Sequence, residues 1–153
     1  MTKMQSDSGS GLISLITQIS KALHRRTTEE LLGMRLKQFM LLGYVRDHAN
    51  GGVSQQELET ALLIDANSVV LLLNELEAAG LSIRRRDPND RRRHLVDLTP
   101  AGRVAVDRAE KARESLEDAI LADFSAEERA SLKKLLRRVL DRMLQAVAEP
   151  AKL

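Results

Sequence analysis

The sequence predicts a mainly α-helical protein that carries one small β-hairpin. Three observations lead to this prediction. Apolar residues recur at the spacing of an amphipathic helix through most of the chain. Residues that favour helix starts precede several of these segments, and one arginine-rich stretch has the alternation and turn residues of two paired strands. With 153 residues, 43% of them hydrophobic, the chain can bury the core of one domain.

Two helices are expected in the first third of the chain. The first runs from Leu12 to about Glu30, where apolar residues recur every three or four positions. Gly33 is suited to end it, because glycine readily adopts the left-handed backbone conformation of a helix C-terminus. A second helix follows from about Leu36 and is stopped by the Asn-Gly-Gly sequence at positions 50–52.

The next two helices have clear start signals. Ser54 and Glu57 form the pattern of a capping box, in which a hydroxyl and a carboxylate each satisfy a backbone donor at the helix start. Asp65 is the expected N-cap of the following helix, which closes at Gly80. This second helix has an apolar stripe that should face the core. The residues of the stripe are Val69, Leu72, Leu73 and Leu76.

Residues 83–98 are predicted to form the hairpin. The turn formers at 87–90 divide this stretch, and apolar or β-branched residues lie on both sides of them. Six arginines occupy the ten positions from Arg84 to Arg93, whereas no lysine or arginine occurs from Asp47 to Ile83. Two interpretations are open: a solvated charged turn, or a probe of DNA phosphates or of the minor groove. The concentration of guanidinium groups favours the second.

Two further helices complete the chain. Thr99 and Pro100 are typical of an N-cap and a first helical residue, and the helix that they start extends to about Asp123. A second capping box at 125–128 starts a last helix with a broad apolar face, which ends before Pro150.

A helix pair followed by an arginine-tipped hairpin is the order of a winged helix-turn-helix, in which the second helix enters the major groove. We therefore expect an N-terminal dimerisation helix (10–33), a winged helix-turn-helix lobe that binds DNA (34–99) and C-terminal dimerisation helices (100–148). The terminal helices present more apolar surface than such a small lobe covers, which favours a homodimer. The alternative is a monomer whose terminal helices pack back on their own lobe.

Composition and motifs exclude several classes of function. The chain has no cysteine, so disulfides, thiolate metal sites and thiol redox chemistry are excluded. Its three histidines are dispersed and no catalytic or phosphate-loop motif occurs, so we predict no enzyme, metal site or cofactor. No apolar stretch approaches the roughly 20 residues that cross a membrane, and no signal pattern is seen. We expect a cytoplasmic protein without a membrane partner.

The hairpin and the residues after it resemble the wing signature of the multiple-antibiotic-resistance regulator (MarR) family. The matching residues are Gly80-Leu81, Arg84, Asp87-Pro88-Asn89-Asp90-Arg91-Arg92, Leu95-Val96 and Leu98-Thr99-Pro100-Ala101-Gly102-Arg103. The helix start at 124–129 and the leucine-rich helix after it are similar to the C-terminal dimerisation element of that family. The resemblance covers the chain from about residue 12 to residue 147.

The resemblance implies a homodimeric transcriptional regulator, usually a repressor, that binds a palindromic double-stranded DNA operator and is often released by a small aromatic or anionic effector. In that family the wing-tip arginine enters the minor groove and is held by an aspartate, which here are Arg92 and Asp90. Arg84 or Arg86 would support the tip or touch the DNA backbone. The complete set of expected DNA-contacting residues is Ser54, Gln55, Gln56, Asn67, Ser68, Val70, Leu71, Asn74, Arg84, Arg86, Asp90, Arg91 and Arg92.

Two features depart from the family pattern. The outward face of the second helix of the pair carries Val70 and Leu71 but no basic residue, although apolar side chains can contact thymine methyl groups. Three acids, Glu75 and Glu77 on the same helix and Glu59 on the helix before it, oppose a polyanion, so the wing should supply most of the affinity. Leu63 occupies a turn position where the family often has a glycine.

An effector that bound between the terminal helices and the lobe would alter the spacing of the DNA-contacting elements. His24, Phe39 and Tyr44 are expected to line its pocket, and the alternative is that they occupy ordinary core or surface positions. A rival function is a winged-helix dimer that binds another protein through Val70 and Leu71 without specific DNA binding. The six arginines of the hairpin argue against that rival.

Overall fold

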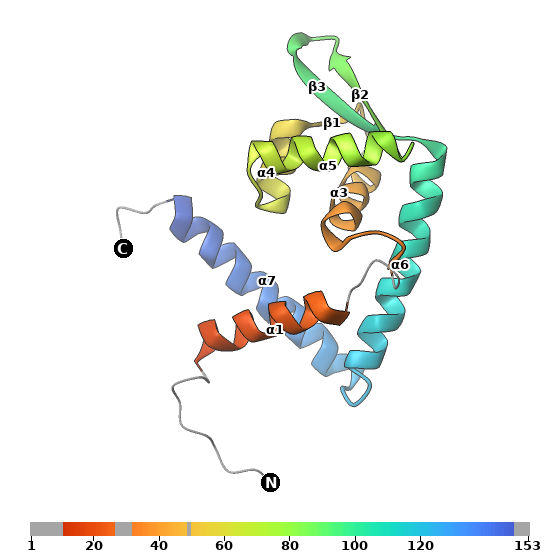
Figure 1. Ribbon diagram of the computed structural model, residues 1–153. Helices are drawn as coiled ribbons and strands as arrows, with labels where there is room; N and C mark the ends of the chain where they lie inside the picture. Colours follow the sequence, from red (N-terminus) through yellow and green to blue (C-terminus); the bar gives the residue numbers. More distant parts are fainter. Residues whose placement is uncertain (1–10, 27–31, 49, 149–153) are drawn as a thin grey trace. The chain divides into compact units, whose positions relative to one another are not determined.

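The computed structural model of the protein describes residues 11–26, 32–48 and 50–148. Its helices and strands are labelled in Figure 1. They are α1 (Leu12–Arg26), α3 (Leu36–Asp47), β1 (Val53–Ser54), α4 (Gln55–Leu62), α5 (Ala66–Ala78), β2 (Ser82–Asp87), β3 (Asp90–Leu98), α6 (Pro100–Ile120) and α7 (Ala126–Ala148). The chain divides into two compact units, and the boundary lies within α6, between Arg113 and Glu114. The predicted mainly helical fold with one hairpin is confirmed.

The helix starts lie where the sequence predicts them, because caps are local hydrogen bonds. The Asp65 carboxylate accepts from the backbone N–H of Ser68 at 2.7 Å and opens α5. The capping box before α7 is reciprocal: Ser125 Oγ accepts from the Glu128 N–H at 3.0 Å, and Glu128 Oε1 accepts from the Ser125 N–H at 2.9 Å. The predicted end of the first helix near Glu30 lies outside the described residues.

The hairpin belongs to a three-stranded antiparallel sheet with the order β1-β3-β2. Strands β2 and β3 pair from Ser82 opposite Leu98 up to the turn, and β1 pairs with the base of β3, where Val53 lies opposite Val96. The sequence did not predict β1, because two residues are too few to show an alternating pattern. This short strand fixes the base of the hairpin to the helices, which supplies the support that two isolated strands lack.

The hydrophobic core of the first unit lies between α3, α4, α5, the base of the sheet and the start of α6. The predicted apolar stripe of α5 is buried in it, with exposed fractions of 6% or less. Val53 and Val96 add side chains from the two paired strands, and Val106 adds one from α6. The core therefore holds the helix pair and the root of the hairpin in one body.

An ion-pair cluster also joins α3 to α6 within this unit. The half-buried guanidinium of Arg46 donates to Asp107 at 3.2 Å and to Glu110 at 3.4 Å, both on α6, and its Nε donates to Asp47 at 3.0 Å. The hydrogen bond to Asp47, followed by the other two acids, raises the pKa of Arg46. Helices α3 and α6 are therefore joined by these ion pairs as well as by the apolar core, to which α6 contributes Val106.

The turn between α4 and α5 has the geometry that glycine usually supplies, although a leucine occupies it. Leu63 has φ 57° and ψ 44°, in the left-handed region, and is the C-cap of α4. Its backbone N–H donates to the carbonyl of Glu59, which ends the helix. The departure from the family pattern therefore leaves the backbone turn intact and places the strain on the leucine itself.

The second unit contains the end of α6 and helix α7. Arg129 on α7 ties the turn between them, because it donates to the Asp118 carboxylate at 2.9 Å and to the carbonyl of Leu121 at 2.7 Å. In the described ranges, no helix is long and apolar enough to pass through a membrane.

Candidate nucleic-acid interface

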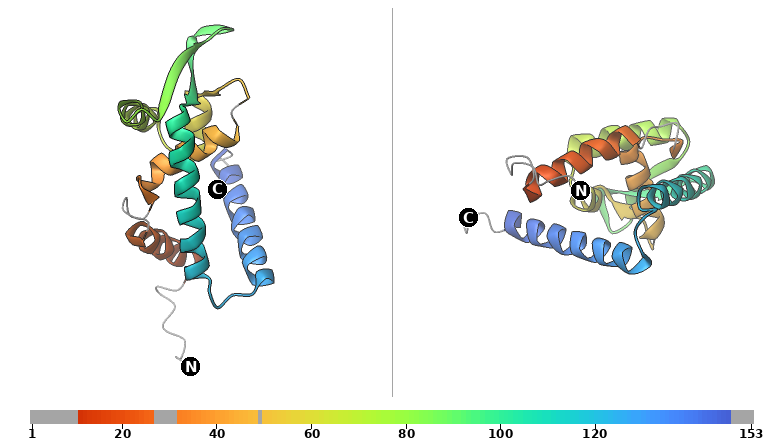
Figure 2. Two further views of the ribbon diagram at one scale, coloured as in Figure 1. Left: turned by 90° about the vertical axis from the view of Figure 1, so that its right-hand side faces the viewer. Right: turned by 90° about the horizontal axis from the view of Figure 1, so that it is seen from below.

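The hairpin extends beyond the helices of the first unit, as the left view of Figure 2 shows. Its tip is a two-residue turn, Pro88 and Asn89, between the paired residues Asp87 and Asp90. The buried Asp87 carboxylate accepts from the backbone N–H of Asn89 at 2.8 Å and so fixes the turn. The same carboxylate lies 3.8 Å from Nε of Arg93 on the returning strand.

Two of the six hairpin arginines are engaged within the protein at the base of the wing. Arg84 forms a bidentate pair with Glu77 of α5 at 2.6 and 3.0 Å, and it also donates to Asn74 Oδ1 at 2.7 Å. Arg85 donates to Asp97 at 2.6 Å and to the backbone carbonyl of Gly51 at 2.9 Å. These contacts fix the wing relative to α5 and to the loop before β1. They also offset part of the positive charge that the sequence places on the hairpin.

The remaining arginines lie toward the tip, and Arg92 is the most exposed of those that form ion pairs. Its side chain is 94% exposed, its Nε lies 3.5 Å from Asp90 Oδ1, and its backbone N–H donates to the same oxygen at 3.1 Å. Arg86 braces this segment from the other strand by donating to the carbonyl of Arg91 at 2.7 Å. Arg92 is thus held at its base while its guanidinium faces solvent.

The wing and the start of α4 together form a polar hollow of about 380 Å³. It brings together expected residues from both elements, namely Ser54, Gln55 and Gln56 with Asp90 and Arg92. It also includes Glu59, Arg93 and His94, which sequence reasoning did not select. Ser54 itself is buried, and its hydroxyl accepts from the Glu57 N–H at 3.1 Å. Gln55 and Gln56 are therefore the more accessible members of the α4 start.

The outward face of α5 is exposed as the helical spacing predicts. Asn67, Leu71 and Asn74 are exposed, whereas Ser68 and Val70 are half-buried. At the N-cap of this helix, the backbone hydrogen bond from Ser68 lowers the pKa of Asp65.

Two of the three acids expected to oppose a polyanion are paired within the protein, and the third, Glu59, lines the hollow beside Arg92. Arg35, at the start of α3, forms an ion pair with the Glu75 carboxylate, and Gln38 donates to the same oxygen at 3.3 Å. Glu77 is the partner of Arg84. Sequence reasoning missed both pairings because their members come from different elements, and the residues of the first are separated by 40 positions.

The three expected effector-pocket residues have different surroundings in the structure. Phe39 is a core residue with 8% exposure, so it takes the ordinary position that the sequence left as the alternative. The Tyr44 hydroxyl donates to Glu57 at 2.8 Å and its ring stacks on His48 with centroids 3.9 Å apart. His24 alone of the three lines a hollow of about 270 Å³. The other residues of that hollow are Leu36, Lys37, Met40, Leu62, Leu63 and Ile64.

The described residues contain no cluster of three or more His, Cys, Asp or Glu side chains that would hold a metal ion. The candidate surface carries the guanidinium group of Arg92, the amides of Gln55, Gln56 and Asn67, and the methyl groups of Leu71. Such groups can bind phosphates and base edges.

Comparisons with known proteins agree with this geometry. The MarR family model matches residues 32–93. The uncharacterised transcriptional regulator YdgJ of Bacillus subtilis is 39% identical over 87 residues, which are 57% of this chain and 53% of YdgJ. The chain spans about half the length of the curated relatives that it matches in this way.

Two solved structures extend the likeness over nearly the whole chain. A crystal structure of MarR has a TM-score of 0.79 and 27% identity, with 95% of this chain and 99% of that one covered. The transcriptional repressor CouR, bound to a 23-mer DNA duplex, has a TM-score of 0.79 and 26% identity over 91% of this chain and 99% of CouR. In its match to the family model, in its relatives and in its fold, the chain is similar to the winged helix-turn-helix proteins of the MarR family.

Proposed function

We propose that this protein is a sequence-specific double-stranded DNA-binding transcriptional regulator that acts as a homodimer on a palindromic operator, as a repressor. The observation that carries the proposal is the geometry of Arg92, whose guanidinium is 94% exposed at the tip of a braced hairpin. The likeness to CouR, a repressor with a DNA duplex bound, supports the same assignment. A regulator of this kind works on DNA in the cytoplasm and requires no cofactor.

Arg92 suits a contact in the minor groove. The negative potential of a narrow minor groove attracts an arginine side chain, and the contact needs no base-specific hydrogen bond. Asp90 limits the conformations of Arg92 through its contacts with both the backbone and the side chain, so less side-chain entropy is lost on binding. Arg91 and Arg86 are exposed beside it and add attraction for the phosphates.

The helix pair supplies the other contacts in this proposal. Helix α5 enters the major groove with Asn67, Ser68 and Leu71 toward the bases, and the start of α4 faces the phosphate backbone. Backbone N–H groups at a helix start bind phosphate, and Gln55 and Gln56 extend that contact into the hollow shared with Arg92. In a homodimer, two copies of this surface would meet two half-sites on one face of the duplex.

A small anionic or aromatic effector would bind in the hollow that His24 lines, rather than in a pocket formed by His24, Phe39 and Tyr44 as the sequence suggested. Lys37 and His24 offer polar contacts at its edge, and Leu36, Met40 and Ile64 offer apolar walls. The hollow also includes Leu63, which lies in the turn between α4 and α5. An occupant there would bias the geometry of the DNA-contacting helix pair and release the operator.

The proposal is tested by selecting bound sequences from a pool of random duplexes and then measuring affinity for the selected duplex as salt is raised. We expect log affinity to fall linearly with log salt concentration. The Arg92→Ala variant should bind the duplex on the order of tenfold more weakly, with a shallower salt dependence. Arg108→Ala, which removes an exposed arginine from α6, is the matched control and should bind as the wild type does.

Two outcomes would contradict the proposal. Unchanged affinity of a folded, dimeric Arg92→Ala variant would remove the wing from the interface. Failure of the wild-type protein to bind any duplex at low salt would reject DNA binding altogether and favour a winged-helix module that binds another protein.

A further inference from the structure

The centre of the exposed face of α5 is apolar. Leu71 is 63% exposed and lies on the side of the helix opposite the buried stripe. Helical spacing places Asn67 one turn before it, and Asn74 and Glu75 one turn after it, in a single outward row. Half-buried Val70 lies beside this row. A large aliphatic side chain thus occupies the centre of the outward face of α5.

The polar side chains that follow Leu71 by one turn are already engaged within the protein. Glu75 is paired with Arg35 and accepts from Gln38. Oδ1 of Asn74 accepts from Arg84, whose guanidinium also neutralises Glu77. These contacts offset part of the repulsion that the two carboxylates would exert on a polyanion. The methyl groups of Leu71 are therefore exposed at the centre of the outward face of α5.

We propose that Leu71 is a specificity-determining residue that recognises the C5 methyl groups of thymine in the major groove of each half-site. This inference rests on the proposed function and names the base chemistry that the DNA-contacting helix selects. Thymine offers the one apolar group on the major-groove edges of the four unmodified base pairs. An exposed leucine can gain from burial only against such a group, because the other edges are hydrogen-bond donors and acceptors that it would leave unsatisfied.

Two other residues of the first unit, Arg92 and Asn67, favour duplex DNA as the partner that contacts Leu71. The exposed guanidinium of Arg92 belongs to the same compact unit as Leu71 and supplies the attraction for phosphates that α5 lacks. Asn67 adds an exposed amide one turn before Leu71, and an amide of this kind pairs with the N6 and N7 edge of adenine. Leucine and asparagine in one row therefore suit the two sides of thymine-adenine pairs.

The test replaces the methyl group and the leucine separately and together. The selected duplex is synthesised with deoxyuridine, which lacks the C5 methyl, in place of thymidine in both half-sites. We expect the wild-type protein to lose about fourfold in affinity for each methyl group contacted, the factor for burying one methylene-sized group. A duplex with 5-bromodeoxyuridine at the same positions should restore binding, because bromine is similar in size to a methyl group.

Leu71→Ala should bind the thymidine and deoxyuridine duplexes with equal affinity, because the side chain that senses the methyl group is gone. Leu71→Met, which stays apolar, should keep a preference for thymidine. Val104→Ala removes methyl groups from a residue of α6 that is 58% exposed, and it should retain the full wild-type preference. Thermal melting followed by circular dichroism establishes that each variant is folded.

Equal binding of thymidine and deoxyuridine duplexes by the wild-type protein would overturn the inference, and so would a Leu71→Ala variant that keeps the full preference. In both cases salt-dependent binding that requires Arg92 would leave the proposed function standing. Failure of that function is a distinct result, because the wild-type protein would then bind no duplex of any kind.

Discussion

Gly102 is a residue at which a single hydrogen atom in place of a side chain shapes the structure. A Cβ at this position would collide with the backbone carbonyl oxygen of Leu81, which accepts from the Thr99 N–H at 3.1 Å. Thr99 also caps α6 through the N–H of Gly102 at 3.0 Å and donates to the carbonyl of Gly80 at 2.7 Å. The Thr-Pro-Ala-Gly motif is therefore explained by the close approach of α6 to the residues that lead into the wing.

Gly102→Ala should destabilise the protein, because the added methyl must displace the backbone near Leu81. We expect the free energy of unfolding to fall by about 2 kcal/mol, in the range of overpacking substitutions. Gly43→Ala is the matched control, because Gly43 lies within α3 with open space around its Cβ position. Alanine there should raise the free energy of unfolding by roughly 0.5–1 kcal/mol. Urea denaturation measures both, and equal shifts of the same sign would contradict the steric argument.

The left-handed backbone conformation of Leu63 could not be predicted from the residue type. The sequence identified the turn from its position between two capped helices, but leucine gave no signal of a left-handed backbone. The structure has φ 57° there because the α4 and α5 helices are both anchored in the core by apolar residues such as Leu58 and Val69. Tertiary packing of the two helices thus outweighs a local conformational cost of about 1–2 kcal/mol.

At the scale of elements, α3 and α4 are joined by a side-chain hydrogen bond that a spectroscopic measurement can isolate. Tyr44 on α3 donates to Glu57 on α4 at 2.8 Å. This bond, assisted by desolvation and by the Glu57 charge, raises the pKa of the tyrosine above its usual value near 10. Tyr44 is the single tyrosine of the chain, and the chain has no tryptophan. The ultraviolet absorbance of phenolate therefore reports this one group.

Titration of the phenol should give a pKa above 10 in the wild-type protein and a lower one in Glu57→Ala. Because the folded-state pKa is raised, the contact contributes its full stability below the unfolded pKa and loses it as the pH rises through the folded pKa. The difference in unfolding free energy between wild type and Glu57→Ala should therefore shrink above pH 10. Glu59→Ala on the same helix is the control, and the assignment fails if it lowers the pKa of Tyr44 as much as Glu57→Ala does.

Elements whose signals are local were predicted from the sequence, and contacts between distant elements were not. Asp65 and Ser125 mark their helices because a cap joins residues three positions apart. The hairpin was recognised from its turn residues and alternation. Strand β1 and the pairing of Arg84 with Glu77 depend on how separate elements meet, which no short sequence pattern contains. The members of the candidate surface remain a prediction from the sequence, and the pairing of Glu75 and Glu77 with arginines became visible in the structure alone.

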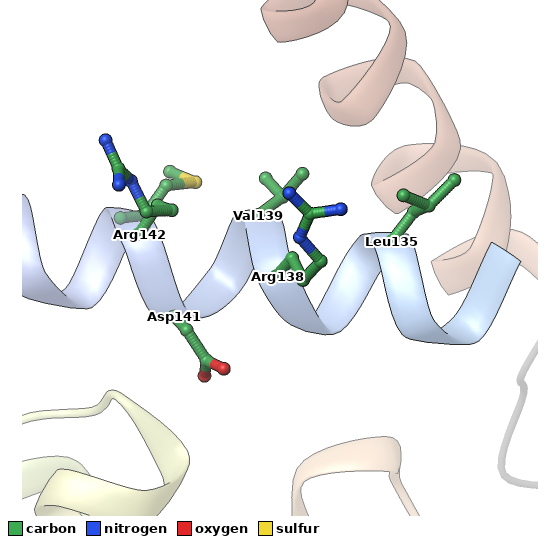
Figure 3. A pocket seen from close by; sticks show the side chains of 6 residues that line it. Leu135, Arg138, Val139, Asp141 and Arg142 are labelled. Atoms are coloured by element: carbon green, nitrogen blue, oxygen red, sulfur yellow. The ribbon is translucent and has the colours of Figure 1, made fainter. Parts of the chain in front are cut away.

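At the scale of the whole molecule, each terminal helix has exposed apolar residues that a single chain leaves in contact with solvent. In α1, Ile13 is 82% exposed and Leu12 is 61% exposed. In α7, Leu135 is 52% exposed, and Figure 3 shows it on the same side of the helix as Val139, with Asp141 on the opposite side. Apolar faces of this kind mark association sites. They support the homodimer proposed above.

Substitution on the apolar side of α7 should separate the proposed dimer. We expect the wild-type protein to sediment as a dimer and to have a melting temperature that rises with concentration. Leu135→Glu would place a charge in the interface, so it should sediment as a monomer at the same concentration and lose most of its affinity for a palindromic duplex. Asp141→Arg changes a charge on the opposite side of α7 and should leave the dimer intact. Dimerisation through α7 is wrong if Leu135→Glu sediments as the wild type does, because an interface built on that face cannot bury an unpaired carboxylate without weakening.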